Sequence, residues 1–340
     1  MTPTPLPGLP PVAPSVLLPM SSFRAFVALV SFSFRRQWRV RQMGWAAVGL
    51  LAVLTATVAV ITHGRAGWNL LGRTERVADR SPMGEIRISH RDYALERLMM
   101  YQSVPGPTMH FALKTALFAP YRAVVLDRQF QTDWAFLNFS RWVMFVMYLT
   151  FLLPLFSLAF ASGAMGTERE GRTLIWLLTR PLPRGAVYLA KFLGVLPWCL
   201  LASVGGLVVL GLAGDELGRH AIRVYWPVAA IGTVAFSALF HLVGALFRRP
   251  AVVGLVYVFF FETLVANLPG SLKQLSLNYY VRSLMYNAAV GETRAATPGN
   301  LDVYAPATPG SSWAVLAAAT VVFTVVGMVA FARQEPADEV

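Results

Sequence analysis

Long apolar runs separated by polar segments dominate this sequence. Six of the runs are long enough to cross a hydrocarbon core of about 30 Å as helices. Backbone polar groups inside a bilayer need partners within their own segment, and a helix provides them. The pattern therefore predicts an all-α integral membrane protein with six transmembrane helices. The predicted helices cover residues 45–62, 142–163, 192–212, 225–247, 251–268 and 313–332.

The two ends of the chain differ in character. Residues 1–20 are rich in proline and lack charge, which predicts a disordered tail. Residues 21–42 combine apolar positions at helical spacing with arginines at their end. This pattern predicts an amphipathic helix lying on an anionic cytoplasmic leaflet, and a basic flank without regular structure is the alternative. Residues 333–340 are acidic and are predicted to form a cytoplasmic tail.

The three connections on the external side of the predicted helices are polar. Residues 63–141 are predicted to form a long external loop that carries specificity, because loops of this length are seldom without a function. Residues 214–223 are predicted to form a short polar turn. Residues 269–312 interleave leucines with polar residues such as Lys273 and Arg282. That arrangement is typical of short helices that dip into the outer leaflet, and a loosely ordered surface loop is the alternative.

The composition supports the membrane class. The chain has 56% hydrophobic and 14% charged residues, whereas soluble chains average about 45–50% apolar and about 25% charged residues. The net charge of +12 does not indicate nucleic-acid binding, because the arginines cluster beside the apolar runs. The basic segments 21–42, 167–191 and 248–249 fall on one side of the predicted helices, so both termini are predicted to face the cytoplasm. The single cysteine, Cys199, excludes a disulfide within the chain.

The polar segment between the second and third predicted helices has features of its own. Thr167 followed by Glu170 matches a capping box, which predicts that a helix begins at Thr167. Leu174, Leu177 and Leu178 give this helix one apolar face, and two prolines end it. The sequence therefore predicts a short amphipathic helix held just outside the membrane.

Motifs of soluble enzymes are absent from the sequence. It contains no G-x-x-x-x-G-K-[ST] phosphate-binding loop, no H-E-x-x-H metal spacing and no G-x-S-x-G nucleophile elbow. We therefore expect no catalytic residue, no metal site and no cofactor in this chain.

The order of residues in the polar segment is distinctive. It reads EREGRTL at 168–174, LLTRP at 177–181, then Arg184, and KFLG at 191–194. This order resembles the cytoplasmic signature of the ABC type-2 transporter permeases, and the order of segments along the whole chain resembles that family too. The most similar members are single-domain permeases of bacterial ATP-driven systems, such as those associated with gliding or with nitrous-oxide reductase maturation. One departure is Arg172, which separates Gly171 from Thr173, where many relatives have glycine and threonine adjacent.

The resemblance implies a function. The segment would be a coupling helix that docks into a cleft of a separate ATPase subunit, with a plain interfacial re-entry helix as the alternative. The chain would be the permease subunit of an exporter in a bacterial cytoplasmic membrane, paired with a second permease subunit as a homodimer or heterodimer. Residues 269–312 would then form an external gate region. The residues that the resemblance assigns to ATPase coupling are Glu168, Glu170, Gly171, Thr173, Leu174, Leu177, Leu178, Arg180, Pro181, Arg184 and Lys191.

Charged residues in or beside the predicted helices are also candidates. Glu262 is the only acidic residue inside one, and an acid at the centre of a span costs about 2.5–3.5 kcal/mol, so it is expected to face protein or water. Two interpretations follow. Glu262 and His241 line a pathway or gate, or Glu262 packs against a neighbour such as His241. Lys191 is expected to extend its ammonium group to the cytoplasmic interface.

Two other functions are compatible with the sequence. A six-span scaffold would use the polar segment as a docking site and would bind its partner without sensitivity to nucleotide. An ion-coupled carrier would depend on Glu262 and would work without an ATPase.

Overall fold

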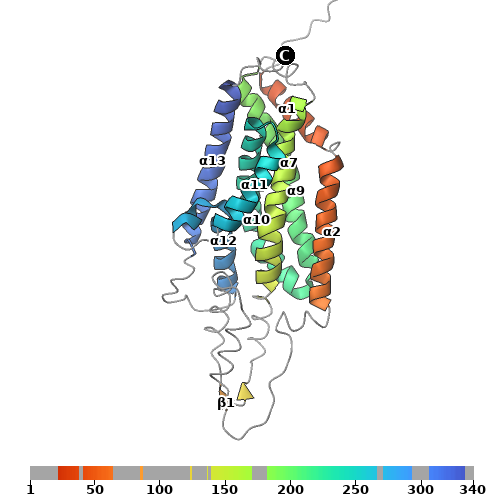
Figure 1. Ribbon diagram of the computed structural model, residues 1–340, viewed down its shortest axis with the longest axis vertical. Coiled ribbons are helices and arrows are strands. Elements are labelled where there is room, and N and C mark those ends of the chain that lie inside the picture. The colour runs from red at the N-terminus through yellow and green to blue at the C-terminus, as the bar shows by residue number, and fades with distance from the viewer. Residues whose placement is uncertain are drawn as a thin grey trace, which may run out of the picture.

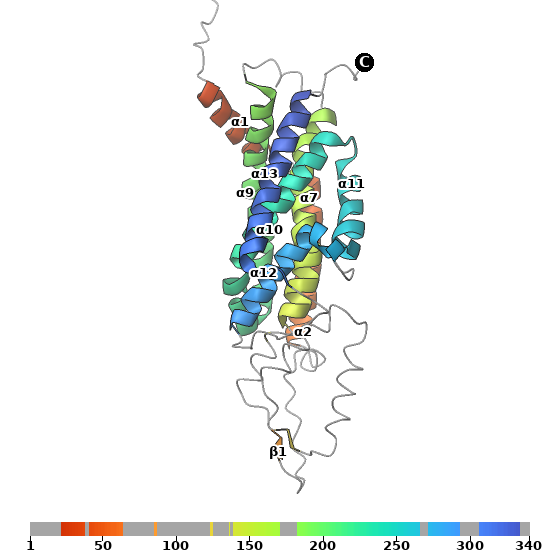
Figure 2. The same ribbon diagram turned by 90° about the vertical axis from the view of Figure 1, so that its left-hand side faces the viewer.

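Long helices lie side by side in the protein and form an elongated bundle (Figures 1 and 2). The structure, a computed structural model, describes residues 22–37, 41–63, 85–86, 123–124, 136, 139–170, 182–265, 271–292 and 306–333. The predicted tails and most of the predicted loop 63–141 lie outside these residues.

The described residues are mostly helical, which confirms the predicted all-α class for this part of the chain. Two-residue strands, β1 (Glu85–Ile86) and β2 (Ala123–Val124), pair in parallel. The α-helices are α1 (Ser22–Gln37), α2 (Arg41–His63), α7 (Leu153–Glu170), α9 (Arg184–Ala213), α10 (Asp215–Leu246), α11 (Pro250–Val256), α12 (Leu277–Glu292) and α13 (Pro309–Arg333). Two π-helices, η1 (Ser140–Leu152) and η2 (Tyr257–Leu264), and a 3-10 helix, η4 (Ser271–Leu275), complete the elements.

Four helical segments among the described residues are long and apolar enough to cross a membrane. They are Ser140–Ala164, Arg184–Ala213, Asp215–Leu246 and Pro309–Arg333. These segments overlap the second, third, fourth and sixth predicted spans. Two shorter apolar helices, Val48–Val60 and Pro250–Thr263, lie in the first and fifth predicted spans. The count of six spans therefore stays a prediction.

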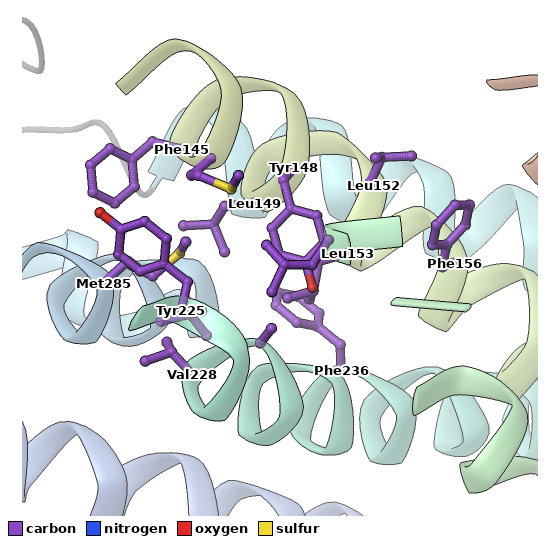
Figure 3. Close-up of a cluster of buried hydrophobic side chains, with 14 of the residues drawn as sticks. Phe145, Tyr148, Leu149, Leu152, Leu153, Phe156, Tyr225, Val228, Phe236 and Met285 are labelled. Atoms are coloured by element: carbon purple, nitrogen blue, oxygen red, sulfur yellow. The ribbon is translucent and has the colours of Figure 1, made fainter. Parts of the chain in front are cut away.

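Helix α10 occupies the centre of the bundle. It packs against α7, α9, α12 and α13, and 83% of its most apolar stretch is buried, compared with 17% for α13. Figure 3 shows the core on one side of α10, where Tyr225, Val228 and Phe236 face side chains of η1 and α7. Met285 of α12 belongs to the same cluster.

The connection between α9 and α10 is much shorter than predicted. Helix α10 begins at Asp215, directly after Gly214, so the predicted turn at 214–223 is wrong. The polar run is helical because it is amphipathic: Gly218 and Ala221 are buried, whereas the charged residues of the run are exposed, namely Asp215, Glu216, Arg219 and Arg223. Asp215 adopts a φ of 58°, which reverses the chain direction in a left-handed conformation that Asp tolerates better than most residues.

The two helices touch backbone to backbone beside this connection. A Cβ atom built on Gly218 would lie 1.7 Å from the carbonyl oxygen of Gly211. A backbone atom cannot move aside as the end of a side chain can, so only glycine fits at position 218. The tight hairpin therefore depends on Gly218.

The segment before α7 is π-helical, with hydrogen bonds that close after five residues rather than four. The N–H of Leu153 donates to the carbonyl of Tyr148, and the hydroxyl of Thr150 donates to the carbonyl of Phe145 at 2.9 Å. Residues five apart therefore stack on one face of η1, as residues four apart do in an α-helix.

We predict that Gly218→Ala destabilises the protein by about 3 kcal/mol or more, because overpacking against fixed backbone has no relief. Gly205→Ala is the matched control on α9, since a Cβ there meets no atom within 4 Å, and it should change stability by less than about 1 kcal/mol. Thermal unfolding in detergent measures both variants. Equal Tm values for the two would contradict the role given to Gly218.

Candidate functional site

The predicted coupling residues fall at the edge of the described structure. Gly171, Thr173, Leu174, Leu177, Leu178, Arg180 and Pro181 lie outside the described residues. Helix α7 continues through Thr167 and includes Glu168 and Glu170, so the predicted helix start at Thr167 is wrong. Thr and Glu are tolerated inside a helix as well as at its start, so the capping-box spacing alone did not distinguish the two places.

The chain re-enters the bundle through a second hydrophobic cluster, which we call the junction cluster. It unites α1, the start of α9, the end of α10 and the end of α13. Its buried members are Leu29, Val187, Tyr188, Ala190, Ala245 and Phe331, and Phe26, Val30, Leu182 and Met328 pack against it. Leu182 lies in the polar segment and is the first described residue after residues 171–181, so the chain passes from the segment into this cluster.

Arg184 ties the start of α9 to the end of α13. Its Nη1 donates to the carbonyl oxygen of Ala332 at 3.5 Å. A cation at a helix C-terminus interacts favourably with the exposed carbonyls there, although an exposed contact of this length contributes little energy. The closer contact is made by Tyr188, because a Cβ on Gly327 of α13 would lie 2.1 Å from its hydroxyl oxygen.

Lys191 lies inside the bundle. Only 2% of it is exposed, so the prediction that its ammonium group reaches the interface is wrong. The reason is the position of the helix start: α9 begins at Arg184, which places Lys191 about two turns inside the helix.

His241 belongs to the same region and joins three helices. It lies on α10 with no exposed surface, and its Nδ1 is 3.3 Å from the carbonyl oxygen of Ala161 on α7. A carbonyl can only accept, so this nitrogen carries the proton. The ring lies 4.6 Å from that of Tyr188 and 5.6 Å from that of Phe192, both on α9.

Helix α1 is anchored on α9 next to the junction cluster. A Cβ on Gly194 would lie 2.7 Å from the Cβ of Ser33, so the two helices cross closely. The Nε1–H of Trp198 donates to the carbonyl oxygen of Phe34 at 3.0 Å, and the two rings stack 5.1 Å apart. Phe23, Val27 and Phe32 of α1 are 74%, 49% and 55% exposed, so the predicted amphipathic helix also has apolar side chains that the described residues do not cover.

Glu262 lies away from His241, in η2, and has four hydrogen-bond donors around it. The hydroxyl of Tyr257 donates to Oε1 at 2.6 Å, and the hydroxyl of Ser276 donates to Oε2 at 2.5 Å. The backbone N–H groups of Leu277 and Asn278 donate to Oε1 and Oε2 at 3.2 and 2.8 Å. The predicted gate residue therefore contacts the first turn of α12.

Helix α12 lies in the region predicted as an external gate, and it is fixed to two neighbours. A Cβ on Gly232 of α10 would lie 3.1 Å from a methyl group of Val281. The Nδ2 of Asn287 donates to the carbonyl of Ala307 at 3.0 Å, and the N–H of Ala307 donates to the hydroxyl of Ser283 at 3.2 Å. Ala307 precedes α13, so these bonds connect α12 to the last helix.

Among the described residues, no three His, Cys, Asp or Glu side chains are grouped so that they could hold a metal ion. The contacts described above join helices to one another. Sequence reasoning did not single out Leu182 or Tyr188, although Leu182 stands between two prolines and so marks the point where the chain must re-enter the bundle.

The comparison with protein families agrees with this arrangement. The sequence profile of the ABC-2 family transporter proteins matches residues 33–335. The chain belongs to this family. The match covers the described helices from the end of α1 to α13, so the Glu262 contacts and the junction-cluster residues of α9, α10 and α13 lie within the matched region.

Curated relatives of this ABC-2 chain share shorter regions. The probable ABC transporter permease protein NosY of Stutzerimonas stutzeri is 33% identical over 133 residues, which are 35% of this chain and 47% of the relative. The protein of the same name from Pseudomonas aeruginosa is 56% identical over 45 residues, which are 13% of this chain and 16% of that relative. The matched region thus spans about half of the first relative and less of the second.

We predict that Trp198→Ala loosens α1. The substitution removes a hydrogen bond of about 1 kcal/mol and an aromatic contact of about the same energy, so local opening should rise roughly ten- to thirty-fold. The measurement is the rate of trypsin cleavage after Arg24 and Arg35. Trp226→Ala is the matched control, because Trp226 is 53% exposed on α10, and it should leave the rate unchanged. Equal rates in both variants would contradict the docking role of Trp198.

Proposed function

We propose that this chain is the permease subunit of an ATP-driven transporter, and that it works with a second permease subunit and a separate ATPase subunit. Membership of the ABC-2 family supports this proposal, and so do the permease names of the two relatives. The junction cluster also supports it, because this cluster joins four helices at the point where the polar segment enters the bundle.

The observation that carries the proposal is the way the polar segment is built into the bundle. Helix α7 ends at Glu170 and α9 begins at Arg184, so residues 171–183 connect two long apolar helices. A partner that moves this segment would displace α7 and α9 directly. Through the junction cluster it would also displace α1, the end of α10 and the end of α13. We therefore assign the ATPase coupling to residues 167–180 together with Arg184 and Lys191.

The same end of the bundle is proposed to face the cytoplasm. Helix α1 and the C-terminal end of α13 lie at the end where the polar segment is attached (Figures 1 and 2). The basic segments 21–42 and 167–191 gather there, as expected for cytoplasmic connections. The membrane is proposed to be the bacterial cytoplasmic membrane, and the direction of transport is proposed to be export, both from the resemblance of the sequence to bacterial exporters.

Two rival functions give different expectations. A scaffold would hold its partner with the same affinity whether or not nucleotide is bound. An ion-coupled carrier would need an acid that exchanges its proton or ion, whereas both carboxylate oxygens of Glu262 already accept hydrogen bonds from protein groups.

The test is purification of the tagged chain in mild detergent from its own host, followed by identification of the proteins recovered with it. We expect an ATPase with a phosphate-binding loop in near-equal amount. Leu174→Asp should lower its recovery by about tenfold or more, because a charge on the predicted apolar face must be desolvated on docking. Thr179→Asp is the matched control, since it adds the same charge outside that face.

The outcomes separate the functions. Loss of the ATPase from the Leu174→Asp chain, with the chain still in the membrane, supports coupling through this segment. Recovery of intact chain with a non-ATPase partner, insensitive to added ATP, favours the scaffold. Equal recovery of the ATPase from both variants would contradict the docking role of the segment.

A further inference from the structure

Helices α11 and η2 lie in the fifth predicted span, and α12 starts partway along the bundle. Helix α11 and η2 together cover Pro250–Leu264, and α12 begins at Leu277. Figure 2 shows α11 ending partway down the bundle, and α12 continuing from there toward the end opposite α1. Leu277, Asn278 and Tyr279 are buried, so unpaired backbone groups in this first turn would be costly.

The backbone N–H groups at the start of α12 need partners outside the helix. The first N–H groups of any helix have no partner within the helix, and a break at membrane depth is tolerated only where protein supplies one. Ser276 precedes the first turn and accepts a hydrogen bond from the N–H of Tyr279 at 3.3 Å. Glu262 accepts those of Leu277 and Asn278. One carboxylate on η2 thus completes the cap of α12.

The π-helical register of η2 makes this contact possible. Tyr257 and Glu262 are five residues apart, which in an α-helix would place them about 140° apart around the axis. Hydrogen bonds over five residues bring them onto one face, and the Tyr257 hydroxyl reaches Oε1. The hydroxyl of Thr263 donates to the carbonyl of Val258 at 3.1 Å, also five residues back.

Four donors on two oxygens satisfy the Glu262 side chain, which is 1% exposed. Hydrogen bonds to a carboxylate are stronger than those between neutral groups, and a negative charge at a helix N-terminus gains further from the helix dipole. Removing the carboxylate would leave two buried backbone N–H groups without their partner, which is unfavourable.

We propose that Glu262 is the positioning residue that holds α12 against η2 and so keeps the end of the bundle opposite α1 closed in the resting state. Helix α12 packs on α10 and is bonded to the segment before α13, so release of its first turn would loosen the region that leads to the last helix. Glu262 acts here through α12 and not as a group that contacts the transported molecule. This inference rests on the transport function proposed above.

The experiment measures access of a water-soluble maleimide to a thiol at position 281, in lipid nanodiscs where both faces meet water. Val281 has no exposed surface and faces Gly232, so Val281→Cys reports opening of α12. Cys199→Ser removes the only native cysteine. We expect Glu262→Ala to raise the labelling rate about tenfold or more, because the lost contacts amount to more than about 1.4 kcal/mol.

Matched variants control the result. Glu216→Ala removes an exposed acid from the first turn of α10 and should leave the labelling rate unchanged. Tyr257→Phe removes one donor to the carboxylate and should give an intermediate rate. It should not raise the rate further when added to Glu262→Ala, since its effect passes through the same carboxylate. A second reporter, Val187→Cys in the junction cluster, should stay protected in every variant unless the whole chain unfolds.

The labelling rate in different states of the transporter distinguishes a positioning role of Glu262 from a general loss of stability. In the complete transporter, trapping the ATPase with vanadate should speed labelling of the otherwise wild-type chain, and it should add nothing to the Glu262→Ala chain. An unchanged labelling rate in Glu262→Ala, or a rise shared equally by the reporter at position 187, would overturn the proposal. Labelling of the resting chain needs no ATPase, so loss of the ATPase partner would count against the transport function and not against the role of Glu262.

Discussion

Close packing around α10 is the constraint on which the rest of the bundle depends, because lipid offers apolar helices no hydrophobic reason to associate. The helices approach where side chains are smallest. Gly218 meets the backbone of Gly211 on α9, and a Cβ on Gly244 would lie 2.8 Å from the carbonyl oxygen of Ser162 on α7. These approaches place α7, α9 and α10 in one rigid group, and the other helices are arranged around it.

The contacts made at the two ends of this group differ in kind. At the end where the polar segment 167–191 is attached, aromatic and aliphatic side chains of four helices form the junction cluster, with His241 bonded to α7. Farther along the bundle, the carboxylate of Glu262 joins η2 to the first turn of α12. The first arrangement suits transmission of a displacement between packed helices, and the second suits a contact that is either made or released.

The sequence predicted the class and most of the apolar helices because hydropathy alone determines which segments enter a membrane. It did not predict that Asp215–Arg223 is helical, since the run reads as polar unless the buried positions of Gly218 and Ala221 are known. The burial of Lys191 was missed because the start of α9 at Arg184 decides it. The partners of Glu262 could not be predicted either, because they lie across a break and depend on a π-helical register that periodicity does not reveal. The predicted coupling face lies outside the described residues and stays a prediction.

The central claim is that a displacement of residues 171–181 enters the bundle through α9. The most direct test is the distance between spin labels on Leu201 of α9 and Phe259 of η2, both exposed, measured in the complete transporter with and without trapped nucleotide. A short Gly-Ser insertion between Pro183 and Arg184 separates the segment from α9. We expect trapping of the nucleotide to change this distance in the chain without the insertion. In the chain with the insertion, the distance should not change although the ATPase remains bound. The same change in both chains would contradict the central claim.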